Sequence, residues 1–259
     1  MPAFARARRL LPGGWLLVLV TSVGCGSRAC SLPTGLAEAS QSLPAPSGPA
    51  SGIATTVEVP GDAPVTVVHA SAEKRNVLVF LHGRCSHPDV DIASWAQIAS
   101  LEGTLLVPRA DQPCPGVDAD VRRWTGDLDQ IQARIDAALA VVGASRAGGV
   151  DTGTITLIGY SEGSARAEAL AGRSPERYRR VILIGSPEIP SPVHLGQTLA
   201  VAFLAGEKDR QDLMRSGQRA LETGGKHARF FELPGAEHGE FGPEGGRVMG
   251  EALTWLGTH

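Results

Sequence analysis

Ser161, Asp209 and His238 each follow an apolar run in the second half of the chain. A serine hydroxyl becomes an effective nucleophile when a histidine accepts its proton and a carboxylate orients that histidine. Ser161 also stands in a Gly-x-Ser-x-Gly segment, where glycines at both flanks permit a sharp turn that lifts the serine above the end of a strand. These residues therefore predict attack of a serine hydroxyl on an acyl carbon.

The elements that must position these residues are predicted by apolar runs that alternate with amphipathic segments. Strands are expected at 55–59, 65–69, 76–81, 104–107, 154–159, 181–185, 199–205 and 230–233, and helices at 92–101, 128–142, from 162, from about 209, and at 246–256. Nearly continuous apolar strands separated by helices indicate an α/β fold, a mostly parallel, doubly wound sheet of about eight strands flanked by helices. Ligands bind at the carboxyl ends of such strands, where the three residues are expected to meet.

Four motifs occur in a fixed order along the chain. They are Leu-His-Gly at 81–83, the serine turn at 159–163, Gly-x-x-Asp at 206–209 and Ala-Glu-His-Gly at 236–239. In these motifs the region from about residue 53 to 256 resembles the α/β-hydrolase superfamily. Within the superfamily it is similar to small single-domain serine esterases of the dienelactone hydrolase and acyl-protein thioesterase kind.

The resemblance implies a role for each residue of the catalytic triad. Ser161 is the nucleophile, and His238 is the general base and then the general acid. Asp209 is the carboxylate that holds the imidazole, because the Gly-x-x-Asp turn places it there. Glu207 and Asp212 are the alternatives for that carboxylate.

The resemblance also implies an oxyanion hole formed by the backbone N–H groups of Arg84 and Glu162. Their side chains are then free to form an ion pair across the mouth of the site or to be solvated. His82 resembles the structural histidine that precedes the oxyanion loop. His87 is close enough in sequence to line the pocket.

No lid domain is expected, because only a short proline-rich loop at 186–198 follows the strand that ends at Gly185. An open site suits small or soluble acyl esters, or an ester carried on a polymer, better than an enclosed triglyceride chain. Trp95, Trp124 and the loop 111–124 are candidates for the pocket walls. For both tryptophans, packing of a helix onto the sheet is the favoured interpretation.

The first 24 residues have the order of a secretory signal peptide: arginines, an apolar run at 15–20, and small residues before Cys25. Cys25 follows Val-Gly as in the bacterial lipoprotein cleavage box, although Ser22 departs from the preferred residue, and is a candidate for lipidation and membrane attachment. Residues 25–52 are rich in Ser, Ala, Pro and Gly and are expected to form a flexible linker before a catalytic domain at 53–259. We therefore expect an exported protein: periplasmic, a cell-envelope lipoprotein, or secreted.

An exported chain is expected to pair cysteines, and Cys85 and Cys114 are the predicted disulfide. Cys85 lies on the expected oxyanion loop, and Cys114 lies in the loop after the neighbouring strand. Their disulfide would hold the two loops together.

Composition excludes some classes of partner. The 259 residues include 24 basic and 27 acidic side chains, a formal net charge of −3, and no basic cluster, so nucleic acid is not expected as a partner. No cluster of His, Cys and carboxylates indicates a metal site, and no metal or cofactor is expected.

The sequence predicts a serine hydrolase that cleaves carboxylic esters through an acyl-enzyme. The alternatives are an acyltransferase or peptidase with the same triad, and a hydrolase-fold binding protein without turnover.

Overall fold

The computed structural model describes residues 51–259. The predicted signal peptide, the lipidation candidate Cys25 and all but the last two residues of the predicted linker lie outside the described residues. Within 51–259, every helix is too short or too polar to cross a membrane.

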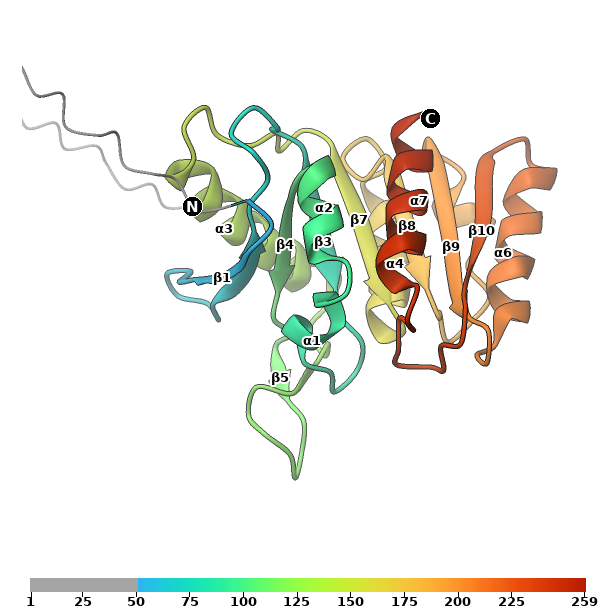
Figure 1. The fold of residues 1–259 in the computed structure, drawn as a ribbon, viewed down its shortest axis with the longest axis horizontal. Coiled ribbons are helices and arrows are strands. Elements are labelled where there is room, and N and C mark those ends of the chain that lie inside the picture. Colours follow the sequence, from blue (N-terminus) through green and yellow to red (C-terminus); the bar gives the residue numbers. More distant parts are fainter. Residues whose placement is uncertain (1–50) are drawn as a thin grey trace, which may run out of the picture. The chain divides into compact units, whose positions relative to one another are not determined.

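An eight-stranded sheet forms the centre of the described residues (Figure 1), with strand order β1-β2-β4-β3-β7-β8-β9-β10. Its strands are β1 (Ala54–Val57), β2 (Val65–Val68), β3 (Val77–Leu81), β4 (Thr104–Pro108), β7 (Ile155–Tyr160), β8 (Arg180–Ile184), β9 (Ala200–Gly206) and β10 (His227–Leu233). β2 is antiparallel to β1 and β4, and all other pairs are parallel. The predicted mostly parallel α/β sheet is confirmed.

Helices cover both faces of the sheet, and Figure 1 shows α2 and α7 in front of it. Four helices pack on one face: α3 (Leu128–Ser145), α4 (Glu162–Arg173), α5 (Pro192–Leu195) and α6 (Gln211–Thr223). On the other face are α1 (Pro88–Ile92), α2 (Ala96–Glu102) and α7 (Gly245–Gly257). In β8, Val181 and Leu183 enter one core while Ile182 and Ile184 enter the other. Both faces of the sheet are buried, which explains the continuous apolar runs.

The single helix expected at 92–101 is wrong, because the structure has two helices, α1 and α2, in this region. The indole N–H of Trp95 donates to the carbonyl of Asp91 at 2.9 Å. In a continuous helix that carbonyl would accept from the backbone N–H of Trp95. The backbone N–H instead donates to the carbonyl of Ile92 at 3.0 Å, so the chain turns before α2 begins.

Three short elements were not predicted from the sequence. β5 (Gln112–Pro113) and β6 (Arg122–Arg123) form an antiparallel hairpin whose loop extends from the lower edge of the fold in Figure 1. The four-residue helix α5 interrupts the loop expected at 186–198.

Candidate active site

Four loops meet at the carboxyl edge of the parallel strands, the lower edge in Figure 1. The loop after β3 carries Arg84 and the loop after β7 carries Ser161. Asp209 follows β9, and His238 follows β10. Because parallel strands end at the same edge of a sheet, the fold brings together residues far apart in the sequence.

The turn from β7 into α4 is sharp. Ser161 has a φ of 51° and a ψ of −115°, a conformation that costs a non-glycine residue on the order of 1–3 kcal/mol. A Cβ on Gly159 would lie 2.4 Å from the carbonyl oxygen of Gly163, and a Cβ on Gly163 would lie 2.0 Å from the carbonyl oxygen of Leu81. Close backbone contact therefore requires both glycines of the motif, and the turn presents Ser161 at the N-terminus of α4.

Ser161, His238 and Asp209 form a hydrogen-bonded row. His238 Nδ1 lies 2.8 Å from Asp209 Oδ2, and His238 Nε2 lies 3.0 Å from Ser161 Oγ. The Asp209 side chain is 8% exposed and the His238 side chain 49% exposed. With its proton on Nδ1, facing the carboxylate, the imidazole has a free lone pair on Nε2. That lone pair can take the proton of the Ser161 hydroxyl.

The alternative carboxylates lie elsewhere. Glu207 Oε2 accepts a hydrogen bond from the backbone N–H of Gly235 at 2.8 Å. Asp212 lies in the first turn of α6. Among the described residues, only Asp209 bonds to the imidazole of His238 through a carboxylate.

Two residues that were not singled out in the sequence support the imidazole. Gly185 has a φ of 52°, and a Cβ there would lie 3.0 Å from Asp209 Oδ2 and 3.3 Å from the His238 ring. Tyr160 stacks on His238 with ring centroids 5.6 Å apart, and its hydroxyl accepts a hydrogen bond from the N–H of Gly239. Burial raises the pKa of Tyr160 to about 12, so the phenol stays neutral beside the imidazole. The signal for Tyr160 was its place directly before Ser161, and that for Gly185 its place at a strand end.

The backbone N–H groups of Arg84 and Glu162 are available beside Ser161. Gly83, which precedes Arg84, packs against the serine, because a Cβ on Gly83 would lie 3.6 Å from Ser161 Cβ. Neither N–H group has an acceptor within residues 51–259. Such N–H groups can stabilise the negative oxygen of a tetrahedral intermediate.

An open hollow of about 400 Å³ lies beside Ser161, and its walls are Arg84, Glu162, Ala165, Arg166 and Pro187. Arg84 Nε and Glu162 Oε1 are 3.0 Å apart, so the two side chains form an ion pair at the mouth of the hollow. The hollow combines two guanidinium groups and one carboxylate with the apolar surfaces of Ala165 and Pro187.

The favoured interpretation of the two tryptophans, packing onto the sheet, is confirmed, and neither they nor the loop 111–124 line the hollow. Trp95 is fully buried against Phe80, and Trp124 is 2% exposed and donates its indole N–H to the carbonyl of His82 at 2.9 Å. Both pack onto the sheet. His87 is exposed at the start of α1, and neither it nor the β5–β6 hairpin lines the hollow.

His82 is a buried, neutral histidine. Its Nε2 accepts a hydrogen bond from the N–H of Ala110 at 3.0 Å, which leaves the proton on Nδ1, 2.8 Å from the carbonyl of Gly83. Burial lowers the pKa of His82 to about 4. The ring therefore links the loop after β3 to the segment after β4 without taking part in proton transfer near neutral pH.

The loop after β3 is held to the β5–β6 hairpin at two points. A disulfide joins Cys85 to Cys114, and the N–H of Cys85 donates to the carbonyl of Arg122 at 2.8 Å. The Arg122 guanidinium in turn donates to the carbonyls of Ala110 and Asp111. These contacts fix Cys85, the residue that directly follows Arg84.

Asp91 is a largely buried carboxyl next to the same loop, and its Oδ2 accepts a hydrogen bond from the Ser86 hydroxyl at 2.8 Å. Burial raises the pKa of Asp91 to about 6, so between about pH 4 and 6 the folded protein holds a proton that the unfolded chain releases. This stabilisation is complete below about pH 4 and is lost as the pH rises through about 6.

Asp91→Asn removes this pH-dependent loss of stability, because asparagine does not titrate. We expect the difference in free energy of unfolding, variant minus wild type, to be about 1–2 kcal/mol more positive at pH 7.5 than near pH 4.5. Urea unfolding of both proteins at the two pH values measures the change. If the free energies of unfolding of variant and wild type differ by the same amount at both pH values, the raised pKa of Asp91 is contradicted.

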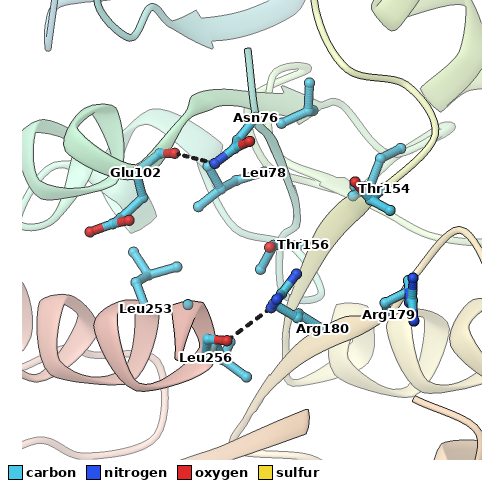
Figure 2. Close-up of a pocket in the computed structure, with 12 residues that line it drawn as sticks. Asn76, Leu78, Glu102, Thr154, Thr156, Arg179, Arg180, Leu253 and Leu256 are labelled. Atoms are coloured by element: carbon cyan, nitrogen blue, oxygen red, sulfur yellow. Dashed lines mark hydrogen bonds between the residues drawn. The ribbon is translucent and has the colours of Figure 1, made fainter. Parts of the chain in front are cut away.

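A second cavity, of about 160 Å³, lies at the opposite ends of the strands (Figure 2). Arg180 Nε donates to the carbonyl of Leu256 at 2.8 Å, and Asn76 Nδ2 donates to that of Glu102 at 3.2 Å. No histidine, serine or cysteine lines this cavity. The candidate active site is therefore the hollow beside Ser161.

No family model matches this sequence. No curated protein matches it either. Solved structures do match its fold. Esterase PE8 is 20% identical with a TM-score of 0.55, over 73% of this chain and 97% of its own. An S-formylglutathione hydrolase from Staphylococcus aureus is 13% identical with a TM-score of 0.58, over 79% and 97%. A dienelactone hydrolase from Anabaena variabilis is 19% identical with a TM-score of 0.54, over 80% and 97%. Together with the order and direction of its strands, this likeness shows that the chain has the α/β-hydrolase fold.

Proposed function

We propose that this protein is a serine esterase that cleaves carboxylic esters through an acyl-enzyme intermediate. The observation that carries the proposal is the hydrogen-bonded row of Ser161, His238 and Asp209 beside an open hollow. The likeness of its fold to an esterase, an S-formylglutathione hydrolase and a dienelactone hydrolase supports it.

In the proposed reaction, Ser161 Oγ attacks the carbonyl carbon of the ester while His238 Nε2 takes the hydroxyl proton. The N–H groups of Arg84 and Glu162 donate to the carbonyl oxygen as it becomes negative. The imidazolium, stabilised by Asp209, donates this proton to the oxygen of the leaving alcohol, and the bond between the acyl carbon and that oxygen breaks. Water then attacks the acyl-serine in the same way, which releases the acid and restores the serine.

The hollow limits the substrates that we propose. It is open rather than enclosed, and its walls combine guanidinium and carboxylate groups with apolar surface. Such a site accepts a small acyl ester, or an ester exposed on a polymer, more readily than a long alkyl chain that needs to be enclosed.

Export is part of the proposal. The arginines, apolar run and Cys25 at the start of the sequence support a secreted or lipid-anchored protein. The disulfide between Cys85 and Cys114 is in keeping with an oxidising compartment.

A fluorophosphonate probe tests the proposal directly, because it phosphonylates only an activated serine. We expect the probe to label wild type and not Ser161→Ala, which removes only the reacting oxygen. Circular dichroism of both proteins serves as the control for folding. Absence of labelling in folded wild type would overturn the proposal and favour a binding protein without turnover.

Matched substrates then separate the ester reaction from its alternatives. An ester and an amide with the same acyl group test esterase against peptidase activity, and an added alcohol acceptor tests acyl transfer. We expect hydrolysis of the ester to be the fastest of the three. Faster cleavage of the amide would identify a peptidase, and a dominant transfer product would identify an acyltransferase.

A further inference from the structure

The carboxylate of Glu162 holds two neighbouring segments at once. Its Oε1 accepts a hydrogen bond from Arg84 Nε at 3.0 Å, and its Oε2 accepts one from the backbone N–H of Trp124 at 3.0 Å. The side chain of Glu162 is 14% exposed, whereas that of Arg84 is 69% exposed. The carboxylate thus lies close to the protein surface but has partners on both oxygens.

One of these partners, Arg84, carries a proposed oxyanion donor, and the other, Trp124, follows the strand that holds the Arg84 loop. One donor is the N–H of Glu162 itself, and the other is the N–H of Arg84. Trp124 follows β6, the hairpin strand whose Arg122 carbonyl accepts from the N–H of Cys85, the residue next to Arg84. The carboxylate of Glu162 therefore closes a ring of contacts that runs from one donor to the other.

The peptide groups of Trp124 are held from α4 on both sides. Its N–H donates to Glu162, and its carbonyl accepts from Arg166 Nη2 at 3.2 Å. Glu162 and Arg166 are four residues apart on one face of the helix. The hairpin is thereby fixed to the same helix turn that supports the nucleophile.

We infer that Glu162 is a positioning residue, whose carboxylate sets the spacing of the two N–H groups that receive the oxyanion. The inference rests on the proposed esterase function. A negative carboxylate near a developing oxyanion is unfavourable for electrostatic reasons, so its benefit must come from placement of the donors. An ion pair to the largely exposed Arg84 side chain adds little to stability, so we expect the effect on the transition state to exceed the effect on the fold.

Four variants test this role. Glu162→Ala removes both contacts, Glu162→Gln keeps one acceptor oxygen, and Arg84→Met removes the ion pair while both backbone donors stay. Glu188→Gln is the matched control. Glu188 is exposed and follows Pro187, which lines the hollow, and its side chain forms no hydrogen bond or ion pair within the described residues. Thermal unfolding of each variant checks the fold.

We expect Glu162→Ala to lower kcat by about 10- to 100-fold with KM within about 2-fold of wild type, since misplaced donors weaken only the transition state. The kcat of Glu162→Gln is expected to lie between those of Glu162→Ala and wild type. Arg84→Met is expected to lower kcat by about 3-fold only, because the bond from Trp124 to Glu162 persists. The double variant of Glu162→Ala and Arg84→Met is expected to be no slower than Glu162→Ala alone. A trifluoromethyl ketone, which forms an oxyanion on Ser161, is expected to lose affinity by the same factor as kcat.

Other results would overturn the inference. It fails if wild type hydrolyses esters while Glu162→Ala and Glu162→Gln both keep kcat within about 2-fold of wild type. It also fails if kcat falls as much in Glu188→Gln as in Glu162→Gln. If Glu162→Ala does not fold, then Glu162→Gln and Arg84→Met decide the question by the same measurements. Failure of the proposed function gives a different pattern, with no turnover and no labelling of Ser161 in folded wild type.

Discussion

Asp209→Asn is expected to lower kcat for ester hydrolysis by about 10⁴-fold. Asp209 Oδ2 lies 2.8 Å from His238 Nδ1, and an asparagine can turn its NH₂ group toward that nitrogen. The imidazole then carries its proton on Nε2 and cannot accept one from Ser161. The fold is expected to persist, because the side-chain oxygen of asparagine can still accept from the N–H of Arg210, as Asp209 Oδ1 does at 2.7 Å.

Steady-state kinetics and the rate of fluorophosphonate labelling measure the loss, with Glu207→Gln and Asp212→Asn as controls. Each control removes one carboxylate charge near the same loop, and neither side chain contacts His238. Both are expected to keep kcat within about 3-fold of wild type. Wild-type activity in Asp209→Asn, with a large loss in one control, would transfer the role to Glu207 or Asp212.

The sheet could be predicted because its central strands are buried on both faces. In β8 and β9, successive side chains enter opposite cores, so the runs 181–185 and 199–205 stand out from the amphipathic helices. The start of β10 could not be predicted in this way. β10 lies at the end of the sheet, and His227 and Arg229 are exposed there, so the apolar run begins only at Phe230.

Residues with reactive side chains could be named from the sequence, and those that act through shape could not. Ser161 was marked by its glycines and its place after a strand, whereas Gly185 matters because a Cβ would crowd Asp209. The bond from Trp124 to Glu162 joins residues 38 apart in the sequence. It depends on the β5–β6 hairpin, whose two-residue strands have no periodic pattern.

Helix α2 shows a related limit of local patterns. The apolar spacing at 92–101 is that of one helix, yet the indole of Trp95 takes the carbonyl that would continue it. The indole of Trp95, which is buried against the sheet, is thus hydrogen-bonded across the break between α1 and α2. The break was not visible in the sequence because no glycine or proline marks it.

Loss of the Cys85–Cys114 disulfide is expected to have the largest effect on stability. The two cysteines are 29 residues apart, and in the chain-entropy model a crosslink of that span contributes about 3–4 kcal/mol. The double variant Cys85→Ala, Cys114→Ala is therefore expected to lower the free energy of unfolding by that amount. Urea unfolding would measure it, with the m-value fitted separately for each protein because loss of the crosslink expands the unfolded chain, and an unchanged midpoint would contradict the prediction.

The same change is expected to reduce kcat by about 10-fold, because Cys85 follows Arg84, whose N–H is the proposed second oxyanion donor. The loss is smaller than that of Asp209→Asn, since the N–H of Cys85 keeps its bond to the Arg122 carbonyl and Glu162 keeps its bond to Trp124. A phosphine reductant should lower the activity of wild type to the level of the double variant and leave the variant unchanged. If the reductant affects both proteins equally, the disulfide does not position the donor, and the backbone and carboxylate contacts alone are enough to hold the loop.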